Sequence, residues 1–83
     1  LREEIGIEVS PSGGALRITR VSRGSAADRA GLAPGDYLVG LNGDEVRSEK
    51  QAEAILNRDF NRTTLLMTVA RGHWQYTLTF PLA

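Results

Sequence analysis

The sequence predicts a small α+β domain, in which two helices pack against five to six mostly antiparallel strands that roll into a partly open barrel. Three observations lead to this fold class. Apolar residues recur at every second position in several segments, as in strands with one buried face. Two other segments begin with a serine that can cap a helix. Gly-Gly, Pro-Gly and Asn-Gly pairs separate the segments and predict tight turns.

The first two strands are predicted to form a hairpin. Residues 5–9, IGIEV, alternate in polarity, and residues 15–21 place Leu16 and Ile18 between polar neighbours. The stretch PSGG at residues 11–14 is expected to end the first strand, because proline lacks an N–H donor and glycine favours turns. The two strands can then pair as antiparallel neighbours.

A short helix is predicted over residues 26–30, within the segment GSAADRAGLAPGD. Ser25 can cap its first N–H groups, and Asp28 can complete a capping box. Gly31 can end the helix, because it adopts the left-handed conformation without strain.

Two turns frame the next strand. Pro34-Gly35 is typical of a type II turn, in which glycine takes the positive torsion. The segment 36–46, DYLVGLNGDEV, then predicts a strand that runs into a hairpin turn at Asn42-Gly43.

A second helix is predicted from Ser48 to about Asn57, with Gln51 at the third position of another capping box. Its apolar stripe consists of Ala52, Ile55 and Leu56. The opposite face is expected to carry Glu49, Lys50 and Glu53. A polar loop with one aromatic residue, Phe60, follows.

A last hairpin is predicted to close the domain. Apolar residues alternate over residues 65–69 and again over residues 74–80, and a turn at residues 71–73 separates the two runs. Trp74, which opens the second run, is expected to pack in the core.

Composition argues against several classes of partner and site. Ten basic and ten acidic residues are scattered through the 83 residues, so no basic surface for nucleic acid or anionic lipid is expected. The chain contains no cysteine, which excludes disulfides and thiolate metal sites. Its apolar runs are far shorter than the roughly 20 residues of a membrane-spanning helix. Residues 1–83 lack an initiating Met and a signal peptide, so we interpret them as a single domain excised from a longer chain.

No catalytic, metal or cofactor site is predicted within the segment. The one histidine, His73, stands in a predicted turn, and no serine lies in a nucleophile elbow. Three acidic residues near predicted turns are expected to form turn and strand-end hydrogen bonds, namely Asp36, Asp44 and Glu45. Paired acids of the kind that hydrolysis or metal binding requires are absent from the pattern.

Gly6 is the unusual residue of the first strand, because it stands between two isoleucines and packs nothing. One interpretation is that it lets the backbone approach a ligand and adopt torsions closed to other residues. The other is that it marks a bulge in an edge strand. An edge strand with unpaired N–H and C=O groups can accept an extended peptide as one more strand.

Three stretches carry a family resemblance. The first is IGI at residues 5–7, which matches a hydrophobic-Gly-hydrophobic carboxylate loop. The second is the segment 24–46, which is similar to the pattern G-S-P-A-x-x-A-G-L-x-x-G-D-x-I. The third is Arg71-Gly72, which matches a turn between closing strands. From about Glu4 to Leu82 the chain resembles a PDZ domain of the bacterial kind found beside HtrA-type serine proteases and other peptidases. Ala26 replaces the usual proline. The resemblance implies the permuted bacterial strand order, in which the strand ending near Phe80 comes last.

The resemblance also implies a function, the capture of hydrophobic C-termini or extended segments of peptides and unfolded proteins by β-strand addition. The peptide would lie between residues 7–10 and the second helix, with its carboxylate at the first three of the implied binding residues. These residues are Ile5, Gly6, Ile7, Glu8, Val9, Ser48, Ala52, Ile55 and Leu56. Met67 could line the pocket for the last ligand side chain, Arg2 could assist the carboxylate, and Glu3 and Glu4 would oppose it.

The parent chain implied by the resemblance is a bacterial or archaeal peptidase, of the HtrA-type serine protease or glycyl-aminopeptidase-like metallopeptidase kind. The domain would then dock substrate or regulate the catalytic domain of that chain, without cofactor, nucleic acid or membrane contact of its own. An extracytoplasmic setting, in the periplasm or cell envelope, is favoured by the resemblance alone. The alternative function is a structural or assembly module whose groove binds its own parent chain or a neighbouring subunit, and exposure of Phe60 and Trp74 would support it.

Overall fold

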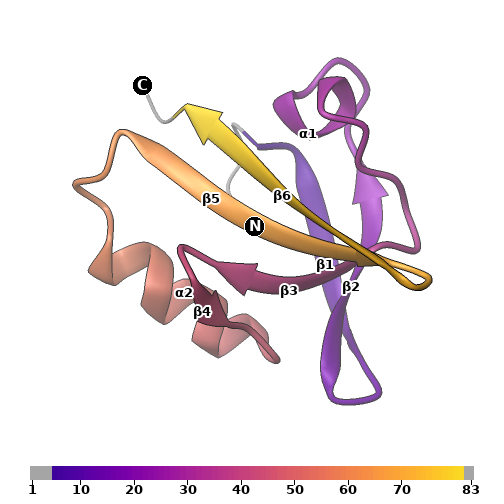
Figure 1. Ribbon diagram of the computed structural model, residues 1–83, viewed down its shortest axis with the longest axis horizontal. Helices are drawn as coiled ribbons and strands as arrows, with labels where there is room; N and C mark the ends of the chain where they lie inside the picture. Colours follow the sequence, from indigo (N-terminus) through magenta and orange to yellow (C-terminus); the bar gives the residue numbers. More distant parts are fainter. Residues whose placement is uncertain (1–4, 82–83) are drawn as a thin grey trace.

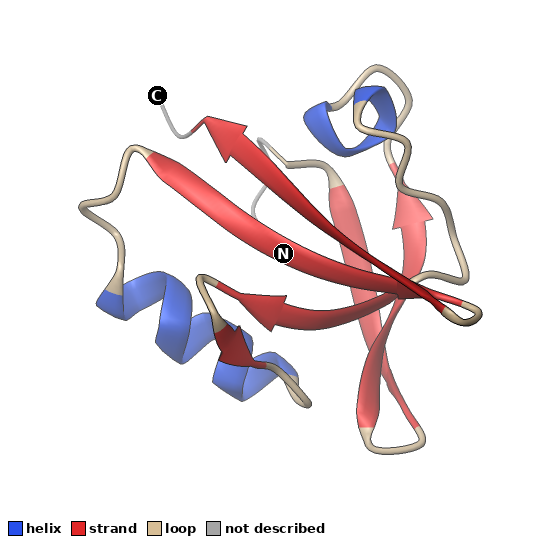
Figure 2. Ribbon diagram, viewed as in Figure 1, coloured by secondary structure: helices blue, strands red, loops and turns tan. Residues whose placement is uncertain are grey.

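The computed structural model describes residues 5–81, which form one open antiparallel sheet and two helices (Figure 1). The strands are β1 (Ile7–Ser12), β2 (Ala15–Val21), β3 (Tyr37–Leu41), β4 (Asp44–Glu45), β5 (Thr64–Arg71) and β6 (Trp74–Pro81). They follow the order β1-β2-β3-β5-β6, and β4 pairs with β3. The helices α1 (Ala26–Arg29) and α2 (Glu49–Arg58) lie on opposite sides of the molecule in Figure 2. The predicted fold class and strand order are confirmed.

The first strand begins and ends later than predicted. β1 covers Ile7–Ser12 and therefore includes Pro11, whereas the expected strand over residues 5–9 stopped before it. Because β1 lies at the edge of the sheet, it tolerates a residue without an N–H donor. The turn to β2 consists of Gly13 and Gly14 alone, whose φ values of 58° and 79° suit a two-residue hairpin.

Both predicted helix caps are confirmed. The Ser25 hydroxyl accepts a hydrogen bond from the Asp28 N–H at 3.2 Å, and the Ser48 hydroxyl accepts one from the Gln51 N–H at 3.1 Å. In return, the Asp28 and Gln51 side chains accept from the N–H of the residue before each cap. Each helix therefore begins where its serine predicts, and α1 ends at Arg29, one residue earlier than expected.

The two predicted tight turns are also confirmed. Asn42-Gly43 joins β3 to β4, so that Leu41 pairs with Asp44. Around Pro34-Gly35, the Asp36 N–H donates to the Ala33 carbonyl at 3.1 Å. This turn brings the chain from α1 into the middle of the sheet.

The core lies between the concave sheet and the two helices. Its buried apolar residues are Ile5, Ile7, Leu16, Ile18, Ala27, Leu32, Leu38, Leu41, Val46, Ala52, Ile55, Leu65, Met67, Val69 and Phe80. Burial decreases along one face of β6, from Phe80 to an exposed Tyr76 and to Trp74, which is 70% exposed. Trp74 begins β6 at the turn of the β5–β6 hairpin (Figure 1), and because its side chain is exposed, the expectation that it packs in the core is wrong.

Candidate functional site

A groove of about 560 Å³ lies between the edge strand β1 and helix α2. It is lined by Glu8, Val9, Glu49, Glu53, Leu56, Asn57 and Phe60. The two β1 residues form one wall, the four α2 residues form the other, and Phe60 follows α2. In the described part of the chain β1 pairs with β2 alone, so one edge of its backbone faces the groove without a neighbouring strand.

Two backbone hydrogen bonds hold the loop that precedes β1. The Ile5 carbonyl accepts from the Ala27 N–H in the first turn of α1 at 3.0 Å, and the Gly6 carbonyl accepts from the Ser22 N–H at 2.8 Å. Across a trans peptide plane, an N–H points opposite to the preceding carbonyl. The Gly6 N–H is therefore directed away from α1, while its own carbonyl is held by the chain that follows β2.

Position 6 requires glycine for two reasons, its backbone torsion and the close approach of Ser25. Its φ is +85°, and a Cβ added to it would lie 2.3 Å from the Ser25 Cβ and 2.5 Å from its Oγ. The expectation of a torsion closed to other residues is confirmed. The alternative that Gly6 marks a bulge is wrong, because the register irregularity of β1 lies between Glu8 and Val9.

The structure distributes the predicted binding residues over three environments. Those that line the groove are Glu8, Val9 and Leu56. Those that are buried and do not line it are Ile5, Gly6, Ile7, Ala52 and Ile55. Met67 is fully buried on β5, and the Ser48 hydroxyl is engaged as the cap of α2. The predicted contributions of Arg2, Glu3 and Glu4 lie outside the described residues.

Four groove residues were not predicted as binding residues, namely Glu49, Glu53, Asn57 and Phe60. The two glutamates were expected on the face opposite the apolar stripe. Instead, Ala52 and Ile55 turn into the core and the adjoining flank of α2 faces β1. The signal was present in the spacing, because residues 49, 53 and 57 are four apart and share one side of a helix.

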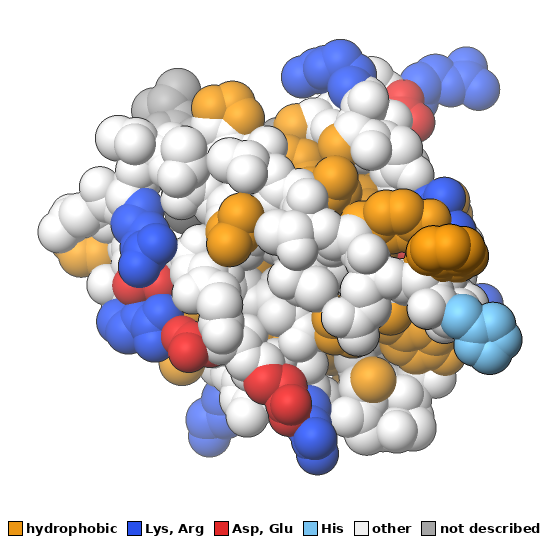
Figure 3. Space-filling model, viewed as in Figure 1, with side chains coloured by type: hydrophobic (Ala, Val, Ile, Leu, Met, Phe, Trp, Pro, Cys, Tyr) orange, Lys and Arg blue, Asp and Glu red, His pale blue; other side chains and the backbone are white. Residues whose placement is uncertain are grey.

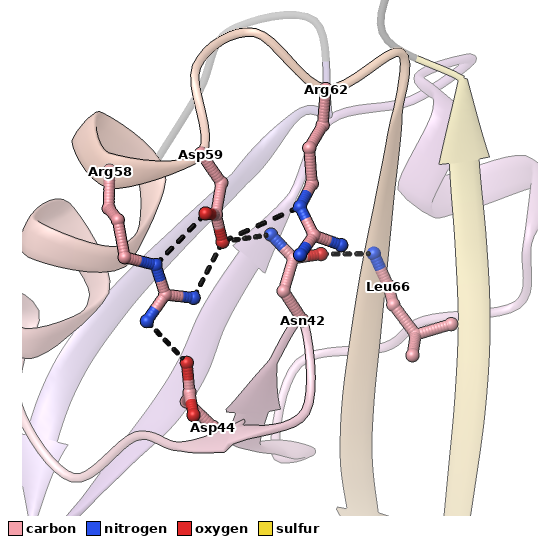
Figure 4. Close-up of polar contacts among 6 residues, drawn as sticks. All are labelled: Asn42, Asp44, Arg58, Asp59, Arg62 and Leu66. Atoms are coloured by element: carbon pink, nitrogen blue, oxygen red, sulfur yellow. Dashed lines mark hydrogen bonds and ion pairs between the residues drawn. The ribbon is translucent and has the colours of Figure 1, made fainter.

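A polar network ties the C-terminal end of α2 to the β3–β4 turn, as Figure 4 shows. The Asp59 carboxylate accepts from Arg58 at 2.7 and 2.9 Å and from the Asn42 amide at 3.0 Å. Asn42 also accepts from the Leu66 N–H at 3.0 Å, and Arg58 reaches Asp44 at 2.7 Å. The Arg58 hydrogen bonds, with that of Asn42, lower the pKa of Asp59 to about 2. This network fixes one wall of the groove relative to the sheet.

A second ion pair joins the turn after α1 to the end of β5. Asp36, which is 3% exposed, accepts from Arg71 through both oxygens at 2.7 and 2.8 Å and from the Ala33 N–H at 3.0 Å. The hydrogen bond from Arg71 lowers the pKa of Asp36. The predicted turn hydrogen bond of Asp36 is confirmed. The side chains of Asp44 and Glu45 form ion pairs instead, with Arg58 and Arg47 respectively.

Neither a metal-binding group nor a membrane-spanning helix is found within residues 5–81. Among these residues, no group of three or more His, Asp or Glu side chains lies close enough together to hold a metal ion. In the same part of the chain, no helix has the length and apolar character that crossing a membrane requires.

Comparison with known families decides the classification. A family model described as a PDZ domain matches residues 17–71, which is more than half of the chain. The chain belongs to the PDZ domain family. This PDZ domain is 30% identical over 69 residues to a probable CtpA-like serine protease of Staphylococcus aureus, and the match covers 82% of the chain but 14% of that protease.

Two solved structures share the fold over nearly the whole chain. The PDZ domain of EpsC from Vibrio cholerae has a TM-score of 0.75 at 17% identity, and the match covers 98% of this chain and 99% of that one. The HtrA3 PDZ domain bound to a phage-derived ligand, FGRWV, has a TM-score of 0.68 at 24% identity. This match covers 95% of this chain and 81% of that one. The predicted family is confirmed, and this PDZ domain is related to a segment of a probable serine protease.

Proposed function

We propose that this PDZ domain captures hydrophobic C-termini or extended segments of proteins, which add to β1 as a further antiparallel strand. The observation that carries the proposal is the open edge of β1 alongside α2, across a groove of about 560 Å³. Strand addition uses the main-chain groups of such an edge for affinity and the adjoining groove for side chains. β6 forms the other edge of the sheet, but the hollow beside it is smaller, about 220 Å³.

The proposed role of the loop at residues 5–7 is to receive the ligand carboxylate. The orientation of the Gly6 N–H, directed away from α1, supports this role, because successive N–H groups in such a loop form an anion nest. The last ligand side chain would lie against Leu56 and Phe60. Burial of one apolar side chain contributes about 1.5–3 kcal/mol, and each main-chain hydrogen bond about 1 kcal/mol net. After the cost of ordering the peptide, micromolar affinity is expected.

The proposed context is a longer peptidase, in which the domain docks substrate termini or regulates the catalytic domain of its own chain. The relation to a probable serine protease supports this proposal, and the chain spans 14% of the length of that relative. Residues 1–83 would then form a single PDZ domain of the peptidase, in an extracytoplasmic setting.

An NMR titration of the 83-residue chain with the peptide FGRWV tests the proposal, with the amidated peptide as control. We expect amide shifts at Gly6, along β1 and along α2 with the free acid, and much smaller shifts with the amide. Equal shifts with both peptides would contradict carboxylate recognition. No shifts along β1 and α2 with either peptide would contradict groove binding itself.

One observation favours the second candidate function, an assembly module. Trp74 is 70% exposed on the edge strand β6, and Tyr76 beside it on the same face is 42% exposed. Hydrophobic side chains gather over the β5–β6 hairpin, at the right of the view in Figure 3. Exposed aromatic residues are common at the centres of interfaces. Sedimentation of the chain and of its Trp74→Ala variant tests this function: a dimer that dissociates in the variant would support it, and a monomer at all concentrations would contradict self-assembly.

A further inference from the structure

We propose that the groove between β1 and α2 selects peptides that carry a lysine or arginine one to three residues before an apolar C-terminal residue. This inference rests on the proposed function, since it specifies which peptide termini the same groove accepts. It follows from the carboxylates that line the groove, from the absence of ion pairs at Glu49 and Glu53 within residues 5–81, and from the positions of these two glutamates along α2.

Three of the seven side chains that line the groove are carboxylates, and none is cationic. Glu8 projects from β1, while Glu49 and Glu53 project from the first half of α2. All three residues are exposed. A peptide in the groove would therefore have acidic side chains on both sides of it.

Few cations offset these charges. Glu8 is 3.6 Å from Arg20, in a pair whose side chains are both well exposed. Such a pair contributes little and leaves the carboxylate open to another partner. Glu49 and Glu53 form no ion pair with any residue in the described part of the chain. Lys50 follows Glu49 in α2 but does not line the groove. The described side chains that line the groove therefore carry three negative charges and no positive charge, and two of the three lie on the first half of α2.

The positions of the two α2 glutamates indicate which part of a peptide meets them. Glu53 and Glu49 precede Leu56 by three and seven residues. At 1.5 Å per residue, these separations are about 4.5 and 10.5 Å along the helix. An extended peptide rises about 3.3 Å per residue, so they equal about one to three peptide residues. With the terminal side chain against Leu56, a cation one to three residues upstream would lie level with the carboxylates.

The expected size of the preference for basic peptides depends on how exposed the groove carboxylates are. An ion pair at an exposed site is worth up to about a fivefold change in affinity, and the same carboxylates repel an acidic side chain. Two glutamates acting together should separate a basic from an acidic peptide by about tenfold at low salt. Raising the ionic strength should reduce this ratio, because the groove is open to solvent.

Calorimetric titration of the 83-residue chain with FGRWV and with FGEWV tests the inference. The two peptides differ only in the residue two places before the terminal valine. We expect FGRWV to bind about tenfold more tightly, and the ratio to fall to about twofold in Glu49→Gln/Glu53→Gln. Glu45→Gln is the control, because it removes a carboxylate from β4 outside the groove and should leave the ratio unchanged. Glu53→Lys should reverse the preference toward FGEWV.

The outcomes separate this inference from the function on which it rests. Equal affinity for the two peptides, or tighter binding of FGEWV, would overturn the basic preference and leave peptide capture standing. A ratio that persists in Glu49→Gln/Glu53→Gln would likewise overturn the assignment to these glutamates. If neither peptide binds, peptide capture in the groove and the basic preference both fail.

Discussion

The missing side chain of Gly6 determines how closely the loop before β1 approaches α1. We predict that Gly6→Ala destabilises the domain and disturbs the proposed carboxylate loop, because its methyl group would overlap Ser25 at a φ of +85°. A left-handed torsion alone costs a non-glycine residue about 1–2 kcal/mol, and the overlap adds to that. Urea unfolding followed by circular dichroism measures the loss.

Two further variants distinguish the stability lost through steric overlap with Ser25 from the stability lost through the left-handed torsion. Gly14→Ala has a similar φ of +79° but open space around its Cβ, so it should cost less than Gly6→Ala. Adding Ser25→Gly to Gly6→Ala removes the obstructing atoms and should restore part of the stability, since glycine is a tolerable cap. Equal losses in Gly6→Ala and Gly14→Ala, with no recovery in the double variant, would show that the overlap is unimportant.

At the scale of elements, the groove depends on the flank that α2 presents to β1. We predict that Leu56→Ala weakens binding of FGRWV by up to about tenfold, because it removes apolar surface worth about 1.5 kcal/mol from the groove. Leu66→Ala is the matched control, since Leu66 is 39% exposed on β5 and does not line the groove. Calorimetric titration measures both affinities, and equal losses in the two variants would contradict a specific role for Leu56.

Local signals were sufficient to predict most elements. Ser25 and Ser48 predicted the helix starts because a cap is formed within four residues. The strands followed from alternating polarity, and the Asn42-Gly43 turn from the torsions that its residues favour. Each of these features is determined by residues that are adjacent in the sequence, so the sequence is sufficient to predict it.

The features that could not be predicted depend on neighbours in space. Pro11 lies within β1 because that strand is at an edge, and the edge is known only once the strand order is known. The helical spacing places Glu49 and Glu53 on one side of α2, but that this side faces β1 depends on Ala52 and Ile55 packing into the core. Trp74 begins β6 at the turn of the β5–β6 hairpin, and its side chain is exposed there.

At the scale of the whole molecule, Asp36 joins parts of the chain that are 35 residues apart, by its ion pair with Arg71. We predict that Asp36→Asn lowers the free energy of unfolding by about 1–3 kcal/mol, the cost of hydrogen bonds lost at a buried polar group. Glu45→Gln, at an exposed residue, is the control for the loss of one negative charge. Urea unfolding at neutral pH compares the two, and an unchanged stability in Asp36→Asn would contradict the structural role of the pair.

Acid is expected to destabilise the whole fold between about pH 4 and pH 2. Arg58 and Asn42 hold the pKa of Asp59 at about 2, and Arg71 lowers the pKa of Asp36. An aspartate in the unfolded chain has a pKa of about 3.9, so in this range the unfolded state binds more protons than the folded state. These aspartates therefore stabilise the fold fully when the pH is above their pKa in the unfolded chain. This stabilisation is lost as the pH falls through their lower pKa in the folded state. Urea unfolding at several pH values measures the slope, which Asp59→Asn should reduce; a slope unchanged in that variant would contradict the role of the Asp59 network.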